Sequence, residues 1–98
     1  MPDDVRSYEV LVVGAGPAGT SAALRAAELG ARVGLLEARR TGGTCVNTGC
    51  VPTRVLAKTA RFVREVRSAA GYGIDVGDPV VDWACTVARV RDVVERIH

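Results

Sequence analysis

The feature that most constrains this chain is a glycine-rich segment placed directly after a short apolar run. Residues 14–19 read GAGPAG, which matches the pattern G-x-G-x-x-G. Residues 8–13, YEVLVV, are β-branched and mostly apolar, as is typical of a buried parallel strand. Residues 17–29 are alanine-rich and are followed by Gly30, a pattern that predicts a helix and its end. A strand that passes through this motif into a helix predicts a phosphate-binding turn.

Each residue of the motif has a physical task in such a turn. Gly14 permits the tight turn out of the strand, and Gly16 lets a pyrophosphate approach the backbone because it has no Cβ. Gly19 lets the helix press against the strand. The first turn of the helix, which begins with Pro17 and Ala18, directs N–H groups and a positive dipole end at the phosphates. The motif serves FAD and NAD equally, because both contain ADP.

An acidic residue follows at the position that a dinucleotide requires. Residues 32–36 predict a second strand, so residues 8–37 form one strand–helix–strand unit. Such crossovers are nearly always right-handed, which makes the two strands parallel neighbours. Glu37 ends the second strand, where its carboxylate can accept hydrogen bonds from the hydroxyls of an adenosine ribose. A glycine-rich turn without a ligand is the alternative, and it does not account for Glu37.

Two further helices are expected after this unit. A loop over residues 41–44 and a turn from Cys45 to Cys50 precede a helix from about Pro52 to Ala70, because proline fits the first turn of a helix. One face of this helix carries apolar or small residues at spacings of three and four: Leu56, Thr59, Val63, Val66 and Ala70. Residues 71–73 end it, and residues 74–81 are expected to form a loop or a short extended piece.

The last helix is expected to begin after Asp82, which can cap it. Its apolar face would consist of Val87, Val90, Val94 and Ile97, and Cys85 is expected to be a small core residue. The predicted fold class is α/β: a partial Rossmann-like domain with one strand–helix–strand unit, two further helices and an incomplete parallel sheet. Because the chain ends at His98 within a helical pattern, residues 1–98 are expected to be the N-terminal portion of a larger domain.

The second candidate site is a pair of cysteines five positions apart. On a regular helix Cys45 and Cys50 would be separated by about 7.5 Å along the axis, whereas a disulfide needs Cα atoms within about 4.4–6.8 Å. Residues 47–49, NTG, are poor helix formers, so the segment is expected to curl and let the sulfurs meet. A helix N-terminus and the positive charge of Arg54 would stabilise a thiolate there. This placement favours redox exchange.

Other uses of these residues remain open at this point. The cysteines could be buried structural thiols, or Cys45, Cys50, Cys85 and His98 could form a metal site. Structural zinc sites prefer a second closely spaced pair, which is absent from the sequence, so no metal is expected. The chain could also be a free-standing dithiol or metal-binding module without flavin, or the start of an NAD-dependent dehydrogenase. Such a dehydrogenase has no use for a dithiol at this position.

Together, residues 14–19, Glu37 and residues 42–52 (GGTCVNTGCVP) resemble the start of the pyridine nucleotide–disulfide oxidoreductases. This family includes dihydrolipoamide dehydrogenase, glutathione reductase and mercuric reductase. The resemblance implies an FAD-binding domain with a redox-active disulfide. Residues 14–19 would hold the FAD pyrophosphate and Glu37 the ribose, and Gly43 and Thr44 would also contact the cofactor.

The resemblance also implies roles for the cysteines. Cys45 would meet the substrate and Cys50 would lie against the flavin. NAD(P)H would reduce the flavin, the flavin would open the disulfide, and the dithiol would reduce a disulfide, lipoamide or mercuric ion. Arg54 stands where most members have a lysine near the reactive edge of the flavin. Arginine keeps the charge but differs in shape, so a flavin contact by Arg54 is an expectation from position.

Much of such an enzyme is missing from these 98 residues. The family's NAD(P)-binding domain, its dimerisation domain and its C-terminal His–Glu pair have no counterpart here, and His98 has no matching context. The chain alone is therefore expected not to turn over, whereas a full-length parent would be a homodimer. A net charge of +2 argues against nucleic acid as a partner. The apolar runs are too short to cross a bilayer and the N-terminus is acidic, so a cytoplasmic location is expected.

Overall fold

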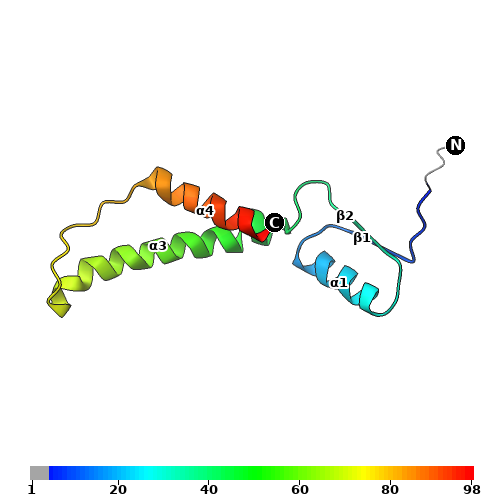
Figure 1. The fold of residues 1–98 in the computed structure, drawn as a ribbon, viewed down its shortest axis with the longest axis horizontal. Coiled ribbons are helices and arrows are strands. Elements are labelled where there is room, and N and C mark those ends of the chain that lie inside the picture. The colour runs from blue at the N-terminus through cyan, green and yellow to red at the C-terminus, as the bar shows by residue number, and fades with distance from the viewer. Residues whose placement is uncertain (1–4) are drawn as a thin grey trace. The chain divides into compact units, whose positions relative to one another are not determined.

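A computed structural model describes residues 5–98, and Figure 1 shows the order of the elements. The chain divides into two compact units, of which the first ends at Asn47 and the second begins at Thr48. The first unit contains a small parallel sheet, one helix packed on it and one very short helix. The second unit is a pair of long helices.

The first unit is built on the strand–helix–strand arrangement that the sequence predicts. Its elements are β1 (Val10–Val13), α1 (Pro17–Glu28) and β2 (Val33–Leu36). The strands are parallel neighbours, with Val10 opposite Val33 and Val13 opposite Leu36. The predicted α/β class is therefore confirmed, and each strand is shorter than expected because regular pairing starts only at Val10 and Val33.

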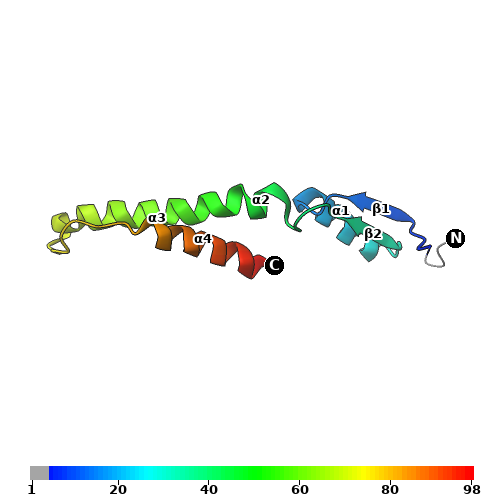
Figure 2. The same ribbon diagram turned by 90° about the horizontal axis from the view of Figure 1, so that it is seen from above.

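Helix α1 packs against one face of the sheet (Figures 1 and 2). Along β1 the side chains alternate, so that Val10 and Val12 are half-buried while Leu11 and Val13 are exposed. The helix ends as predicted at Gly30, which adopts the left-handed φ of +89°. The N–H of Gly30 donates to Ala27 and that of Ala31 to Ala26, a Schellman motif that satisfies carbonyl groups at the helix end.

A short helix, α2 (Gly43–Asn47), lies where a loop and a turn were expected. The prediction was wrong because intrinsic propensity does not decide this segment. Gly42 and Gly43 both adopt left-handed angles, with φ of +101° and +64°, and they turn the chain into the helix. The side-chain amide of Asn47 then donates to the carbonyl oxygen of Gly43 at 2.8 Å, one turn earlier.

The second unit consists of α3 (Cys50–Ser68), the 3₁₀ helix η1 (Ala69–Tyr72) and α4 (Trp83–Ile97). Helices α3 and α4 run antiparallel and lie side by side in both views (Figures 1 and 2). Val55 and Val94 are their buried residues. No helix within residues 5–98 combines the length and apolarity needed to cross a membrane.

The boundaries of these helices differ from the predicted ones by about a turn or less. Helix α3 begins at Cys50, two residues before Pro52, so the proline occupies the first turn, where its missing N–H costs nothing. Residues 74–81 contain no regular structure, as predicted. Asp82 caps α4 as predicted, because its Oδ1 accepts the N–H of Cys85 at 3.0 Å. At the far ends of the two predicted stripes, Ala70 and Ile97 are exposed.

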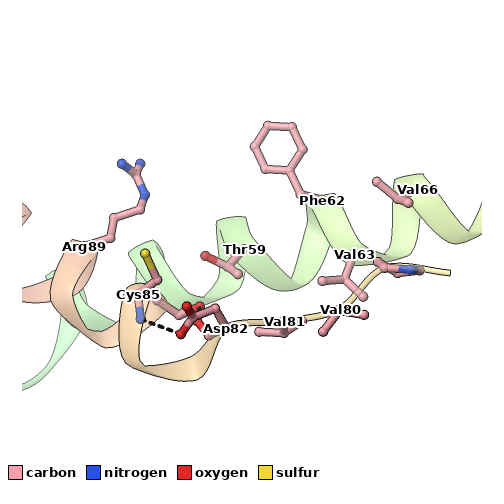
Figure 3. Close-up of a pocket in the computed structure, with 11 residues that line it drawn as sticks. Thr59, Phe62, Val63, Val66, Val80, Val81, Asp82, Cys85 and Arg89 are labelled. Atoms are coloured by element: carbon pink, nitrogen blue, oxygen red, sulfur yellow. Dashed lines mark hydrogen bonds between the residues drawn. The ribbon is translucent and has the colours of Figure 1, made fainter. Parts of the chain in front are cut away.

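Cys85 is exposed, so its predicted place in the core was wrong. It lines a pocket of about 380 Å³ between the two helices. Figure 3 shows it opposite Thr59 of α3, and Arg89 follows it by one turn of α4. The segment of residues 79–81 lines this pocket beside the first turn of α4. The cysteine therefore faces an open groove and not a packed helix.

Candidate dinucleotide site and thiol pair

The glycine turn has the backbone geometry that the motif demands. Gly14 has a φ of +103°, which a residue with a side chain rarely adopts, and its N–H donates to the carbonyl oxygen of Leu36 at 2.7 Å. A Cβ on Gly19 would lie 1.7 Å from the carbonyl oxygen of Gly14. Gly19 is therefore the residue that allows α1 to start directly against the turn.

The N-terminus of α1 opens at this turn. Gly16 is the N-cap residue and Pro17 the first helical residue, and no side chain among residues 5–98 caps the helix there. The first N–H groups of a helix have no acceptor within the helix, and they carry the positive end of its dipole. Ala18 and Gly19 follow in this first turn, so the turn can present its backbone donors to an anion.

Glu37 lies directly after β2 and reaches the turn. Its Oε2 accepts a hydrogen bond from the N–H of Ala15 at 2.9 Å, in a partly buried position. A pocket of about 500 Å³ opens at the carboxyl ends of both strands, and Gly14 and Glu37 are among the residues that line it. In open parallel sheets, ligands bind in this location.

These residues fit the ADP half of a dinucleotide. The turn has no side chain that would fill the space beside Gly14, since a Cβ built there meets no atom of residues 5–98 within 4 Å. The carboxylate of Glu37 keeps a second oxygen that can accept from a ribose hydroxyl. The site thus combines donors for a pyrophosphate with an acceptor for a ribose.

The start of α2 approaches the same turn within the first unit. The N–H of Gly42 donates to the carbonyl oxygen of Ala15 at 2.8 Å. A Cβ on Gly43 would lie only 2.8 Å from the Cα of Gly16, so Gly43 must be glycine for the two backbones to come this close. Thr44, on the first turn of α2, is exposed next to this contact.

The structure places the two motif cysteines on different helices. Cys45 lies in the middle of α2 and is half-buried, whereas Cys50 is exposed at the first position of α3. Arg54 follows Cys50 by one turn, so the two share one face of α3 and both are exposed. Gly49 precedes α3 as its N-cap, with no side-chain cap from the described part of the chain.

The structure contains no disulfide among residues 5–98. Because Cys45 belongs to the first unit and Cys50 to the second, their pairing stays a prediction. The same part of the chain contains no group of three or more His, Cys, Asp or Glu side chains that could hold a metal ion.

Two contributors to this site were missed in the sequence. One is the backbone of Ala15, which is 1% exposed and is bonded through both its N–H and its carbonyl group. The other is the side chain of Asn47, which bonds to the chain before α2. The role of the Ala15 backbone could not be predicted from the sequence, because every residue has the same backbone groups. The second could have been found from the unusual position of asparagine four residues after a glycine pair.

Comparison with known proteins gives a family match over nearly the whole chain. The family model described as pyridine nucleotide-disulphide oxidoreductase matches residues 8–97. The dihydrolipoyl dehydrogenase of Acholeplasma laidlawii is 38% identical over 93 residues, which make up 94% of this chain and 28% of that protein. That of Thermus scotoductus is 41% identical over 70 residues, or 71% of this chain and 15% of the relative. That of Bacillus subtilis is 38% identical over 88 residues, or 88% and 19%. The chain thus spans 15% to 28% of the length of these relatives.

Proposed function

Because this chain belongs to the pyridine nucleotide-disulphide oxidoreductase family, we propose that it is the FAD-binding, disulfide-bearing segment of a flavin-dependent oxidoreductase. The observation that carries the proposal is the N-terminus of α1, without a side-chain cap from residues 5–98, beside Glu37 at the carboxyl ends of both strands. FAD bound there would supply the two-electron chemistry of its flavin ring.

Different residues of the site would bind different parts of FAD. The N–H groups at the start of α1 would bind the pyrophosphate, with Gly16 allowing close approach. Glu37, held by its bond to Ala15, would accept a ribose hydroxyl through its other carboxylate oxygen. Gly43 and Thr44 would extend the binding surface from the turn toward Cys45.

Cys45 and Cys50 would interconvert between a dithiol and a disulfide. When a dithiol substrate meets the disulfide, two S–H bonds of the substrate and the S–S bond of the protein break. The substrate sulfurs form their own S–S bond, and the two protons and two electrons pass to the protein thiols.

The named relatives favour a dihydrolipoyl group as that dithiol substrate, because each carries the name dihydrolipoyl dehydrogenase. A disulfide or mercuric ion is the alternative substrate that the family resemblance leaves open. Either would be reduced by the dithiol of Cys45 and Cys50, with NAD(P)H as the source of the electrons. A nicotinamide nucleotide as the other redox partner and a homodimeric assembly belong to the proposal for a whole protein of this family. With a dithiol substrate, the oxidised nicotinamide would accept the electrons.

A titration with FAD tests the binding half of the proposal. Flavin fluorescence is followed as the chain is added, and the expected result is saturable binding at one FAD per chain, with ADP as a competitor. Absence of saturable binding by a chain whose circular dichroism shows folded helices would contradict the proposal. Stoichiometric zinc uptake by the same sample, lost on replacing Cys45 or Cys50, would favour a dithiol module without flavin.

Disulfide mapping tests the redox half. The chain is oxidised with lipoamide in its disulfide form, remaining thiols are alkylated, and peptides are identified by mass spectrometry. A link between Cys45 and Cys50 is expected, with Cys85 alkylated as an internal control. A product in which Cys85 forms the links, or in which all three cysteines are alkylated, would contradict the assignment.

A further inference from the structure

The side-chain amide of Asn47 donates hydrogen bonds to three backbone carbonyl groups that precede it in the chain. Its Nδ2 donates to the carbonyl oxygens of Gly43 at 2.8 Å, Thr41 at 3.1 Å and Arg40 at 3.4 Å. An amide nitrogen has two N–H bonds, so at least one of them is shared between two carbonyls. The shortest bond closes one turn of α2, and the other two reach the segment that precedes the helix.

This segment depends on such support because its own backbone is weakly determined. Helix α2 has five residues, which is too short for a helix to be stable by itself. It is preceded by two consecutive residues in left-handed conformations, Gly42 and Gly43, which lose much conformational freedom on folding. The backbone bond from Val46 to Gly42 is long, at 3.4 Å. The Asn47 amide supplies two shorter bonds to the same turn, at 2.8 Å to Gly43 and 3.1 Å to Thr41.

One peptide group connects this amide to the glycine turn. The peptide between Thr41 and Gly42 accepts from Asn47 through its carbonyl oxygen, at 3.1 Å, and donates to Ala15 through its N–H, at 2.8 Å. A peptide group is planar and rigid, so fixing one end orients the other. Ala15 in turn donates its own N–H to Glu37 at 2.9 Å. A continuous chain of hydrogen bonds therefore runs from Asn47 to Glu37.

We propose that Asn47 is a positioning residue, which fixes the helical turn that carries Cys45 and, through the Thr41–Gly42 peptide, locks that turn to the nucleotide-binding residues Ala15 and Glu37. The part that concerns nucleotide rests on the proposed function. The part that concerns Cys45 does not, because it follows from the hydrogen bonds of the protein alone. Asn47 contacts neither a reacting sulfur nor the proposed phosphate position in the bonds described above; it acts through the backbone.

The test replaces the donor while keeping its shape. Asn47→Asp replaces Nδ2 by an oxygen, which cannot donate, so the three hydrogen bonds are lost. The carboxylate oxygen would also be repelled by the three carbonyl oxygens that it faces. Ser21→Asp, at an exposed position on α1, adds the same charge to the same unit and serves as the matched control. Asn47→Gln, which keeps the amide on a longer side chain, is expected to give an intermediate result.

The readout is the rate at which iodoacetamide alkylates each cysteine, measured on peptides by mass spectrometry. In Asn47→Asp, the alkylation rate at Cys45 is expected to rise about tenfold relative to that at Cys85 in the same molecule. Loss of one net hydrogen bond makes opening of the turn easier by about this factor. The control is expected to leave this ratio unchanged. An unchanged ratio in Asn47→Asp would overturn the proposal. Equal acceleration at all three cysteines would also overturn it, since the substitution would then act by unfolding the chain.

Measurements on the unsubstituted chain keep the proposal testable if the variants do not fold. After correction for intrinsic exchange rates, the N–H of Gly42 is expected to exchange at least about tenfold more slowly than that of Val80, because one net hydrogen bond corresponds to about this factor. Val80 is 95% exposed in the loop over residues 74–81. Equal corrected rates at Gly42 and Val80 would overturn the proposal. An FAD titration of the same samples separates the two claims. If the chain binds no FAD while the Cys45 ratio shifts as expected, the proposed function fails and the positioning role stands. If FAD binds and the ratio is unchanged, the positioning role alone fails.

Discussion

Replacing Gly19 by alanine should break the glycine turn at which we propose that the nucleotide binds. The new Cβ would lie 1.7 Å from the carbonyl oxygen of Gly14, whereas Cβ contacts in proteins are essentially never closer than 3.0 Å. Helix α1 and the turn must therefore separate by more than an ångström. Neither atom belongs to a flexible side chain, so the strain falls on the backbone. Overpacking of this kind typically costs about 1–3 kcal/mol, and a backbone-to-backbone clash belongs at the upper end.

The effect can be measured locally by amide hydrogen exchange. The N–H of Gly14 is bonded to Leu36 across the strand ends, and it should exchange about a hundredfold faster in Gly19→Ala, as a cost of about 3 kcal/mol implies. FAD affinity should fall by a similar factor. Gly71→Ala is the matched control, because its Cβ would meet no atom of the described residues within 4 Å and its φ is not left-handed. If Gly19→Ala kept the exchange rate and the FAD affinity within about threefold, the steric reasoning would be wrong.

Two further substitutions test the acceptor beside the turn and the cap of the last helix. Glu37→Ala removes the acceptor of the Ala15 N–H and of the proposed ribose bond, so FAD affinity measured by fluorescence should fall about tenfold to a hundredfold. Glu28→Ala, an exposed change of the same type on α1, should leave the affinity unchanged, and equal losses in both variants would refute the role of Glu37. Asp82→Ala removes the cap of α4 and should cost about 1 kcal/mol, measured as faster amide exchange in that helix. No change in exchange there would show that the cap contributes nothing.

The parts of the fold that the sequence predicts are those decided by neighbouring residues. The turn from Gly14 to Gly19 is recognisable because Gly14 adopts a left-handed angle and Gly19 packs directly on Gly14, so both needs lie within six residues. Gly30 and Asp82 mark a helix end and a helix start through bonds to atoms only a few positions away. The parallel pairing of the two strands follows from the handedness of the crossover between them.

The parts that were missed depend on residues distant in sequence or on packing. Two glycines and an asparagine argue against a helix at α2, and its existence follows from the Asn47 amide and from the bond between Gly42 and Ala15, 27 positions earlier. The exposure of Cys85 depends on the path of residues 79–81 beside α4, which no local pattern reveals. The disulfide between Cys45 and Cys50 stays a prediction from spacing and family resemblance.

The central claim is that a nucleotide anchored at the glycine turn extends its flavin to the segment that carries Cys45. The most direct test compares FAD with ADP by mapping amide chemical shifts in the NMR spectrum of the chain. ADP should perturb the turn from Gly14 to Gly19 and Glu37 only, whereas FAD should perturb these and also the amides of α2. Identical maps for the two ligands would contradict the claim, as would perturbations confined to the second unit.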